Sequence, residues 1–548
     1  MGAEVKQIFR NRWHMGAACA LACAAATPSL AADPSLPHIE SRNGHHALIV
    51  DGSPFLMLGA QANNSSNYPS ALPKVWPMLD RLNANTLEIP VAWEQIEPQE
   101  GKFDFAWVDL LLNEARAHDK RLVLLWFATW KNTSASYAPE WVKTNPGRFP
   151  RMITDKGEKH YALSPHGTRT LEADRRAFVR LMEHLKANDP QHTVIMVQPE
   201  NETGSYRLAR DHSPEANRLF AGTVPAELTR KLRKKPGTWT ELFGRDAEGA
   251  FQTWYLASYV NAIAAAGKAV LPLPMYVNAA LPGHPDVWQA PGTYASGGPV
   301  PAMLDIWKAA APAIDIEAPD IYNTDHGDYI GFLDQYNRAD NPLFVPETGS
   351  SKVYSRFFFP VVGKGAIGFS PFGLDFTGYT NFPLGAAKLD DEAISGFALN
   401  YRLFGQLVRV WPKLALEGKT QGVAEPTNPA AKHAQEMRFG RWRATVTFGR
   451  PQFGTDEPKG NDFPSGGAAM AQLGPDEFLV TGVHARVDLA LAEPKPGEQT
   501  QILRAEEGHY DAAGQWVFDR VWNGDQTDWG LNFTSVPQLL RVTLSTLR

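Results

Sequence analysis

The sequence predicts a (β/α)8 barrel followed by a smaller antiparallel β-sandwich-like domain, and three observations carry this prediction. Eight short apolar runs alternate with amphipathic segments between about residue 50 and residue 410. These runs are nearly continuous in apolar residues, as strands of a parallel sheet buried on both faces are. After Pro412 the pattern changes: apolar and polar residues alternate in short segments that are separated by Gly, Pro and Asp, which is typical of an antiparallel β domain. At 548 residues the chain exceeds one compact core, and a barrel with an accessory domain accounts for its length.

The eight predicted strands lie at residues 55–60, 86–91, 121–127, 193–198, 269–277, 315–322, 342–347 and 365–372. Between them, apolar residues recur at helical spacing, for example Val108, Leu111, Leu112 and Ala115. A count of eight such units indicates a closed barrel. An open doubly wound sheet is the alternative, but no Gly-rich phosphate loop follows the first run.

Residues 1–32 are predicted to be an export signal. Three basic residues precede a small apolar run at 15–26, and a small-x-small cleavage site follows near Ala31 or Ala32. Both cysteines, Cys19 and Cys23, lie inside this segment, so the exported chain would contain no disulfide. A lipoprotein anchor at Cys23 is the alternative to the soluble periplasmic protein that we expect.

The remaining chain divides into a predicted catalytic barrel at 33–412 and a β domain at 413–548. Segments 442–448 and 477–489 alternate in the manner of strands. The β domain could bind carbohydrate, but a structural role against the barrel is an equally good interpretation.

The composition excludes some classes of partner. The net charge of −6 gives no electrostatic reason for binding nucleic acid or an anionic membrane, and no membrane span is predicted. The histidines lack the spacing of a zinc site, and we expect neither a metal nor a cofactor. Sixteen tryptophans suit a sugar-binding cleft, although a large core explains them at least as well.

In a (β/α)8 enzyme the active site lies at the C-terminal ends of the strands. The polar and aromatic residues that end the predicted runs are Gln61, Asn63, Trp93, Glu97, Trp130, Lys131, Asn132, Glu200, Asn201, Glu202, Asn278, Tyr322, Asn323, Glu347 and Asp375. Each of them alone could simply enter a loop. Together they predict a mouth lined by carboxylates and amides, flanked by aromatic side chains.

Two glutamates on opposite sides of a barrel mouth suit glycosidic bond cleavage, which needs one protonated carboxyl and one attacking carboxylate. Glu347, at the end of the seventh predicted strand, is the candidate nucleophile. At the end of the fourth strand, Asn201 can bind a sugar hydroxyl while the following Glu202 points toward the leaving group. This argument favours Glu202 over Glu200 as the acid.

Residues 197–206, with the sequence VQPENETGSY, resemble the VQ-x-ENE-x-GSY segment of glycoside hydrolase family 35, the retaining β-galactosidases. Residues 91–105 and 138–142 are similar to two further segments of that family, so the resemblance covers the barrel from roughly 40 to 410. It implies that Glu202 is the acid/base and Glu347 the nucleophile. The resemblance is greatest to a bacterial subgroup with a short β domain, which includes enzymes that trim β-galactose from xyloglucan.

The sequence also departs from the family. Pro90 stands where many members have a tyrosine, and residues 130–133 replace a Cys-Ala-Glu-Trp segment, so Asn132 takes the place of a galactose-binding glutamate. The resemblance still implies a substrate-binding set with distinct tasks. Hydroxyl contacts are expected from Gln61, Lys131, Asn132 and Asn201, apolar walls from Trp130 and Phe372, orientation of the nucleophile from Tyr322, and a pocket position for Glu200 if its strand stays extended.

The sequence therefore predicts an exo-acting retaining β-galactosidase that removes terminal β-D-galactose from oligosaccharides by double displacement, with xyloglucan side chains as one candidate substrate. Another retaining glycosidase of the same clan is the first alternative, for example a β-glucosidase, a β-mannanase or an arabinofuranosidase. A non-catalytic carbohydrate-binding barrel is the second.

Overall fold

The computed structural model describes residues 36–427, 434–449, 458–536 and 538–547. The predicted export signal, its cleavage site and both cysteines lie outside these residues. Within the described ranges, no helix has both the length and the apolar character needed to cross a membrane.

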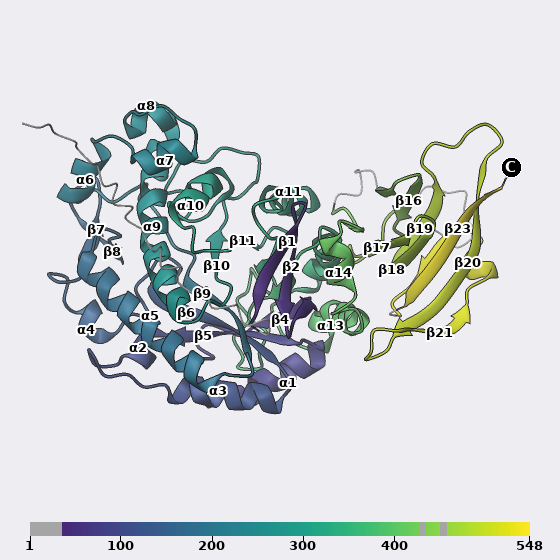
Figure 1. Cartoon of the computed structure of the whole chain (residues 1–548), viewed down its shortest axis with the longest axis horizontal. Helices are drawn as coiled ribbons and strands as arrows, with labels where there is room; N and C mark the ends of the chain where they lie inside the picture. The colour runs from purple at the N-terminus through teal and green to yellow at the C-terminus, as the bar shows by residue number, and fades with distance from the viewer. Residues whose placement is uncertain (1–35, 428–433, 450–457, 537, 548) are drawn as a thin grey trace, which may run out of the picture. The chain divides into compact units, whose positions relative to one another are not determined.

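Eight parallel strands form the barrel, in the order of the chain, as the sequence predicts (Figure 1). They are β4 (Met57–Gln61), β5 (Thr86–Ala92), β6 (Arg121–Lys131), β9 (Val194–Asn201), β10 (Tyr276–Ala280), β11 (Ile316–Ile321), β12 (Val345–Thr348) and β13 (Gly368–Pro371). Strand β13 pairs with β4, and a parallel bridge between Val197 and Met275 joins β9 to β10. The ring of strands is thereby closed, which confirms the barrel over the open sheet.

A helix follows each strand and packs outside the ring (Figure 1). These helices are α1 (Leu72–Leu82), α3 (Ala106–Ala117), α5 (Thr168–Asn188), α9 (Ala247–Val270), α10 (Leu304–Ala310), α11 (His326–Tyr336), α12 (Phe358–Gly363) and α13 (Asp391–Gly405). In α3 the four residues that mark the predicted helical face, Val108, Leu111, Leu112 and Ala115, are all buried. Burial of this apolar stripe against the strands holds the helix in place.

The fifth predicted strand is only partly right. Helix α9 continues to Val270, and strand β10 begins at Tyr276 rather than within the first half of the run 269–277. Pro272 and Pro274 lie between them, and proline lacks the N–H that either a helix or a sheet ladder would use. The chain therefore leaves the helix and enters the sheet only after the second proline.

The two ends of the barrel differ. Strands β1 (His38–Arg42), β2 (His45–Val50) and β3 (Ser53–Phe55) form a small sheet, and its apolar residues pack with the first residues of the barrel strands, closing that end. At the opposite end the loops are long. They carry α2 (Trp93–Ile96), α4 (Glu140–Lys143), the hairpin of β7 (Arg151–Ile153) and β8 (Lys159–Leu163), and the helices α6 (Pro214–Phe220), α7 (Ala226–Lys231) and α8 (Trp239–Phe243).

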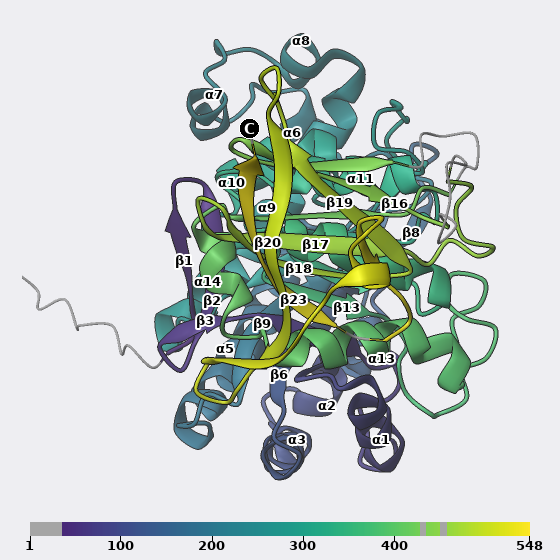
Figure 2. The ribbon, with the colours of Figure 1, turned by 90° about the vertical axis from the view of Figure 1, so that its right-hand side faces the viewer.

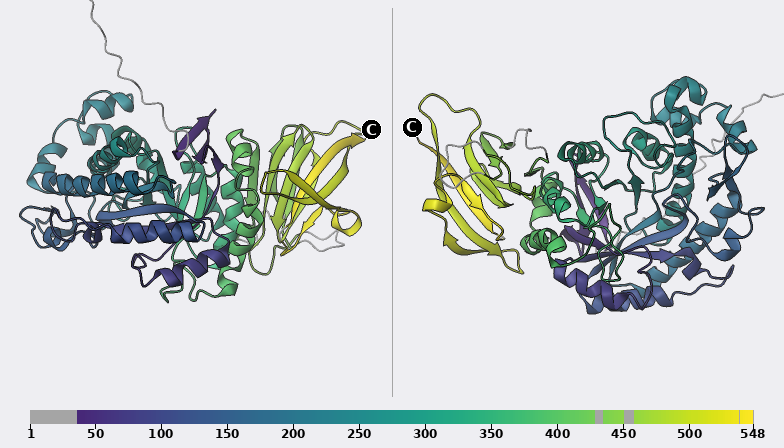
Figure 3. Two further views of the ribbon diagram at one scale, coloured as in Figure 1. Left: turned by 60° about the horizontal axis from the view of Figure 1, so that its bottom comes forward. Right: turned by 180° about the vertical axis from the view of Figure 1, so that it is seen from behind.

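Beyond the barrel, two antiparallel sheets face each other. One contains β14 (Thr420–Ala424), β17 (Gly467–Gly474), β18 (Glu477–Val483), β23 (Leu539–Leu547), β20 (Gln499–Tyr510) and β21 (Trp516–Val521); the other contains β15 (Gln435–Phe439), β16 (Trp442–Thr447), β19 (Ala485–Leu491) and β22 (Leu531–Phe533). Apolar residues from both sheets share one core, which makes the pair a sandwich (Figure 2 and Figure 3). The predicted segment 477–489 is two strands, one in each sheet, joined at His484 with a left-handed φ of 47°.

The sandwich contacts the barrel through the segment that follows β12. The predicted domain boundary at residue 412 falls within α14 (Trp411–Leu416), and β14 packs against α12. A Cβ on Gly422 would lie 2.0 Å from the carbonyl oxygen of Phe359, so only glycine allows this approach. The buried Arg356, in the turn η3 (Lys352–Phe357), donates to the carbonyl of Glu425 at 3.0 Å.

Candidate active site

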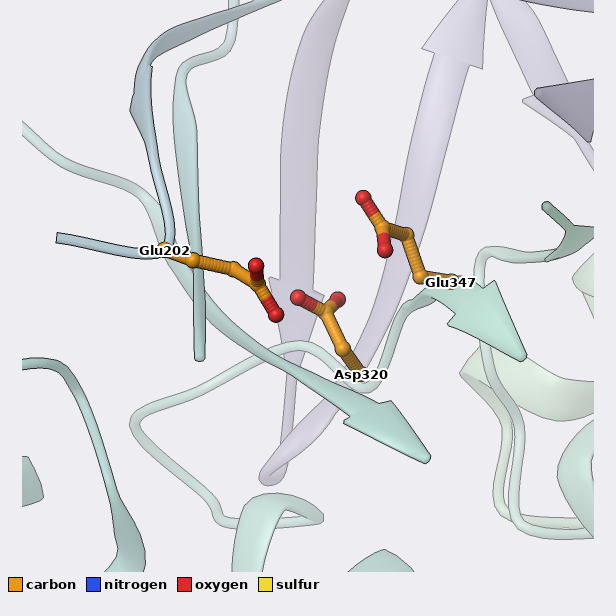
Figure 4. A group of neighbouring side chains, drawn as sticks. All are labelled: Glu202, Asp320 and Glu347. Carbon is orange, nitrogen blue, oxygen red and sulfur yellow. The ribbon is translucent and has the colours of Figure 1, made fainter. Parts of the chain in front are cut away.

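Three carboxylates meet at the C-terminal ends of the barrel strands (Figure 4). Glu202 directly follows β9, Asp320 lies in β11 and Glu347 lies in β12. One oxygen of each carboxylate is within 4.8 Å of the other two. The structure thus brings Glu202 and Glu347 together, as the sequence predicts, and adds Asp320, which the sequence reasoning missed.

The carboxylate of Glu347 is fixed by three donors. Gln61 donates to Oε1 at 2.9 Å, and Asn201 reaches the same oxygen at 3.5 Å. The hydroxyl of Tyr322 donates to Oε2 at 3.0 Å. Because donors from three different strand ends contact one carboxylate that is 4% exposed, its orientation is determined before any substrate arrives.

Glu202 takes a backbone conformation that non-glycine residues rarely adopt, with a φ of 42°. Its N–H donates to Oδ1 of Asn278 at 2.9 Å, which holds this conformation. Burial and the neighbouring charge of Glu347 raise the pKa of Glu202 to about 7, and Lys131 acts in the opposite direction. A carboxyl with this pKa can carry a proton at neutral pH and can also release it.

Asp320 is a third carboxyl in the same group and is 3% exposed. Asn278 donates to its Oδ2 at 2.8 Å, while its Oδ1 has no hydrogen-bond partner. Burial and the charges of Glu347 and Glu202 raise the pKa of Asp320 well above its ordinary value. The sequence signal was an acidic residue inside the predicted run 315–322, two positions before its expected end at Tyr322.

A fourth buried carboxyl, Glu88 of β5, lies inside the barrel. Its Oε2 accepts from the hydroxyl of Tyr276 at 3.1 Å, and burial raises the pKa of Glu88 to about 8. It too stands within an apolar run and was not anticipated.

Glu200 does not join this group. Its φ of 65° shows that the strand does not stay extended, so the expected shared face with Glu202 is not formed. Its carboxylate instead accepts from the N–H groups of Thr129 at 3.3 Å and Trp130 at 2.6 Å. Burial and the nearby Asp174 raise the pKa of Glu200 well above its ordinary value.

Trp130 and Lys131 point to opposite sides of β6, because side chains alternate along a strand. Trp130 is fully buried, donates to the carbonyl of Leu163 at 3.2 Å and packs edge-on against Tyr259. It is a core residue, and its predicted role as a wall of the sugar pocket is therefore wrong. Lys131 instead faces the mouth, where its Nζ donates to Oδ1 of Asn201 at 2.7 Å and to Oδ1 of Asn132.

Phe372 lies beside this group at the end of the last strand. It is 5% exposed, forms a parallel bridge with Gln61 and donates its N–H to the carbonyl of Thr348 at 2.9 Å. It therefore remains at the mouth, next to a residue that contacts Glu347.

Glu202, Asp320 and Glu347 are also, among the residues that the structure describes, the group whose oxygens lie close enough together to hold a metal ion. Their donors are hydrogen-bonding amides and a tyrosine, which orient carboxylates without requiring a cation.

Comparison with known proteins gives two family models. Residues 73–265 match the glycoside hydrolase family 42 model, described as beta-galactosidase, and residues 397–534 match a domain of unknown function (DUF5597). A beta-galactosidase of Xanthomonas manihotis is 31% identical over 201 residues, which are 35% of this chain and 31% of that protein. Beta-galactosidase 11 of Arabidopsis thaliana is 27% identical over 125 residues, 21% of this chain and 14% of that protein. The chain thus matches under a third of the length of either curated relative.

Among solved structures, the beta-galactosidase from Bacillus circulans sp. alkalophilus has a TM-score of 0.47 at 13% identity, covering 65% of this chain and 57% of that one. The cold-adapted beta-galactosidase from Rahnella sp. R3 has a TM-score of 0.47 at 15% identity, covering 68% and 59%.

Over part of its length the chain is thus similar to proteins described as beta-galactosidases. Membership of family 35 stays a prediction, because the model that matches is that of family 42.

Proposed function

We propose that the protein is an exo-acting, retaining β-galactosidase, with Glu347 as nucleophile and Glu202 as acid/base. The observation that carries the proposal is the short separation of the two carboxylates, with oxygens within 4.8 Å. Retaining enzymes place the two groups about 5 Å apart, whereas inverting enzymes need about 6.5 to 9.5 Å to admit a water molecule. The β-galactosidase family match, which includes Glu202, supports galactose as the sugar.

In the first step Glu347 attacks the anomeric carbon while Glu202 donates its proton to the glycosidic oxygen. The C–O bond to the leaving group breaks, and a galactosyl ester forms on Glu347. A pKa of about 7 supports Glu202 in this role, because much of it is protonated at neutral pH.

In the second step Glu202 must act as a base toward water. Once Glu347 is esterified its negative charge is gone, and that charge is one cause of the raised pKa of Glu202. The pKa of Glu202 therefore falls in the intermediate, and its carboxylate takes a proton from water, whose oxygen bonds to the anomeric carbon as the ester bond to Glu347 breaks and galactose is released.

The proposed substrate contacts come from the residues that surround the pair. Lys131, Asn132 and Asn201 form a connected polar group beside Glu347, suited to several sugar hydroxyls. Gln61 keeps a buried Oε1 without a hydrogen-bond partner, which can accept from a hydroxyl. The predicted export signal supports a periplasmic enzyme acting on oligosaccharides, with xyloglucan side chains as the proposed natural source.

The decisive experiment uses a 2-deoxy-2-fluoro-β-galactoside with a good leaving group, which slows the second step and traps the ester. Inactivation with the label on the peptide that contains Glu347 is the expected result, and Glu347→Ala should be neither labelled nor active. Labelling of another residue would remove the assignment of the nucleophile. Activity that survives in Glu347→Ala would overturn the mechanism.

The same pair also suits another retaining glycosidase, such as a β-glucosidase, a β-mannanase or an arabinofuranosidase. This alternative is worth testing because Lys131 and Asn132 differ from the residues of family 35 at these positions. A panel of aryl glycosides separates the two: faster turnover of a glucoside, mannoside or arabinofuranoside than of the β-galactoside would exclude the galactosidase. A protein that hydrolyses none of them would favour the non-catalytic carbohydrate-binding barrel.

A further inference from the structure

The exposed aromatic side chains of the barrel gather at one end. Among the described residues up to 410 they are Tyr68, Tyr161, Tyr206, Trp288, Tyr379 and Phe382. Each lies in the connection between a barrel strand and the following barrel helix or, for Tyr161, in strand β8 of such a connection, and so at the end where Glu202 and Glu347 meet. Aromatic faces are costly to leave in water, so the members of this set that lie beside Glu202 are candidates for ligand contact.

Two of the six lie beside Glu202: Tyr161 is connected to it through Thr133, and Tyr206 follows it by four residues. The N–H of Thr133 donates to the carbonyl of Glu202 at 3.2 Å, and the Thr133 hydroxyl is 2.6 Å from that of Tyr161. His160 links the other side, since its Nε2 lies 3.0 Å from the carbonyl of Tyr206 and its ring is 4.1 Å from that of Tyr161.

The turn that carries Thr133 is strained. Lys131 and Ser134 exchange backbone hydrogen bonds of 2.7 and 3.0 Å, and the two residues between them, Asn132 and Thr133, have φ values of 49° and 63°. This is the geometry of a type I′ turn, for which Asn-Gly is preferred. A β-branched threonine there is an outlier whose cost needs a reason. Glycine would relieve the strain but would lose the hydroxyl that contacts Tyr161.

The backbone on both sides of Tyr206 is also fixed by hydrogen bonds, although this residue is 36% exposed. Ser205 and Ser296 exchange backbone hydrogen bonds of 3.0 Å on one side of it, and Arg207 donates to the carbonyl of Gly292 at 2.8 Å on the other. Partial burial, Glu202 and Tyr161 all raise the pKa of Tyr206, so its phenol stays a neutral donor.

In the mechanism proposed above, the role of Glu202 determines which part of the substrate binds on its side of the mouth. Glu202 protonates the glycosidic oxygen, so the departing group lies on the Glu202 side, while the galactose ring lies against Glu347. We propose that Tyr161 and Tyr206 form the leaving-group subsite and bind the first sugar ring of a carbohydrate leaving group. The aromatic faces stack on the apolar face of a pyranose, and the phenols donate to its hydroxyls. The site thus prefers a sugar as leaving group over a small aglycone, an inference that rests on the proposed function.

The test compares two substrates that differ only in the leaving group. One is a β-galactosyl-glucose disaccharide, and the other is β-galactosyl fluoride, whose leaving group is one atom and needs no aglycone contact. In Tyr161→Ala and Tyr206→Ala, kcat/KM for the disaccharide should fall by about tenfold or more, the effect of truncating an aromatic anchor. The value for the fluoride should stay within about twofold, which also shows that each variant is folded.

Tyr379→Ala is the matched control. Tyr379 is also an exposed tyrosine of the mouth, but it follows β13, which lies across the barrel from β9. Its variant should leave the ratio of the two kcat/KM values unchanged. Equal losses on both substrates in the Tyr161 and Tyr206 variants, or an unchanged disaccharide rate, would overturn the subsite.

The proposed function can fail separately. If the wild-type enzyme hydrolyses neither substrate, or if Glu347→Ala still hydrolyses them, the mechanism fails and the subsite fails with it. If the wild type hydrolyses both and the ratio does not change in the tyrosine variants, the subsite alone is wrong.

Discussion

Tyr322 directly follows β11, Glu347 lies in the neighbouring strand β12, and the tyrosine hydroxyl donates to Oε2 of the glutamate at 3.0 Å. The opposite oxygen accepts from Gln61, so each oxygen of the carboxylate has its own donor. The attacking atom is thereby held in place from both sides.

Tyr322→Phe should lower kcat for an aryl β-galactoside by roughly 10- to 100-fold, since a hydrogen bond to a charged group contributes about 1.5 to 3 kcal/mol. Tyr336→Phe removes another buried hydroxyl, one that donates to the carbonyl of Pro299, and should leave kcat unchanged. A kcat for Tyr322→Phe within twofold of wild type would show that the donors to Oε1, Gln61 and Asn201, suffice.

The pH profile of kcat/KM should lose activity as the pH rises through about 7, because Glu202 must be protonated to act as the acid and its pKa is about 7. Lys131 lowers this pKa. Lys131→Met should therefore move the alkaline limb to higher pH, whatever it does to the maximal rate. The exposed Lys102→Met should leave the limb in place, and a downward shift in Lys131→Met would contradict the electrostatic account.

Asp320→Asn tests whether Asp320 carries a proton in the resting site. Its pKa is raised by burial and by both neighbouring glutamates, so we expect the neutral acid, which asparagine imitates in shape. Activity should change by no more than about threefold, because the contact from Asn278 survives. A clear downward shift of the alkaline limb would mean that an ionised Asp320 had been raising the pKa of Glu202.

Glu202→Gln should make the protein more stable at alkaline pH while abolishing its function as an acid. The pKa of Glu202 rises from 4.5 to about 7 on folding, which corresponds to roughly 3 kcal/mol. This contribution is present in full below pH 4.5 and is lost as the pH rises to about 7, where the folded protein must bury a charge. Urea unfolding at pH 8 should show the gain and unfolding at pH 4 should not, with the exposed Glu158→Gln as control.

The rule that polar residues end the strands of a barrel at one mouth was enough to predict that Glu202, Glu347, Gln61 and Tyr322 lie together. Buried parallel strands are legible because they are apolar throughout, and a polar residue marks where each one emerges. Glu202 and Glu347 belong to the fourth and seventh of the eight strands, and this separation predicts that they face each other across the mouth.

Finer placement depends on where each strand ends and how its last residues bend. Strand β6 runs to Lys131 rather than to Phe127, and this decides that Trp130 enters the core while Lys131 faces the mouth. The left-handed φ of Glu200 turns its side chain away from Glu202, and no side-chain type announces such a bend. Asp320 was hidden because its strand continues to Ile321, one residue beyond it.

Arg356 ties the two halves of the sequence together. Its buried guanidinium donates to the carbonyl of Thr324, in the loop after β11, and to the carbonyl of Glu425 and the hydroxyl of Thr427 beyond the barrel. A chain shortened at residue 412 would remove two of these acceptors and the residues that cover the guanidinium, a few residues after the strand that presents Glu347. We therefore expect that trimming or exchanging the sandwich disturbs the segment around β12, which carries Glu347. A chimaera should join the two parent sequences upstream of β12.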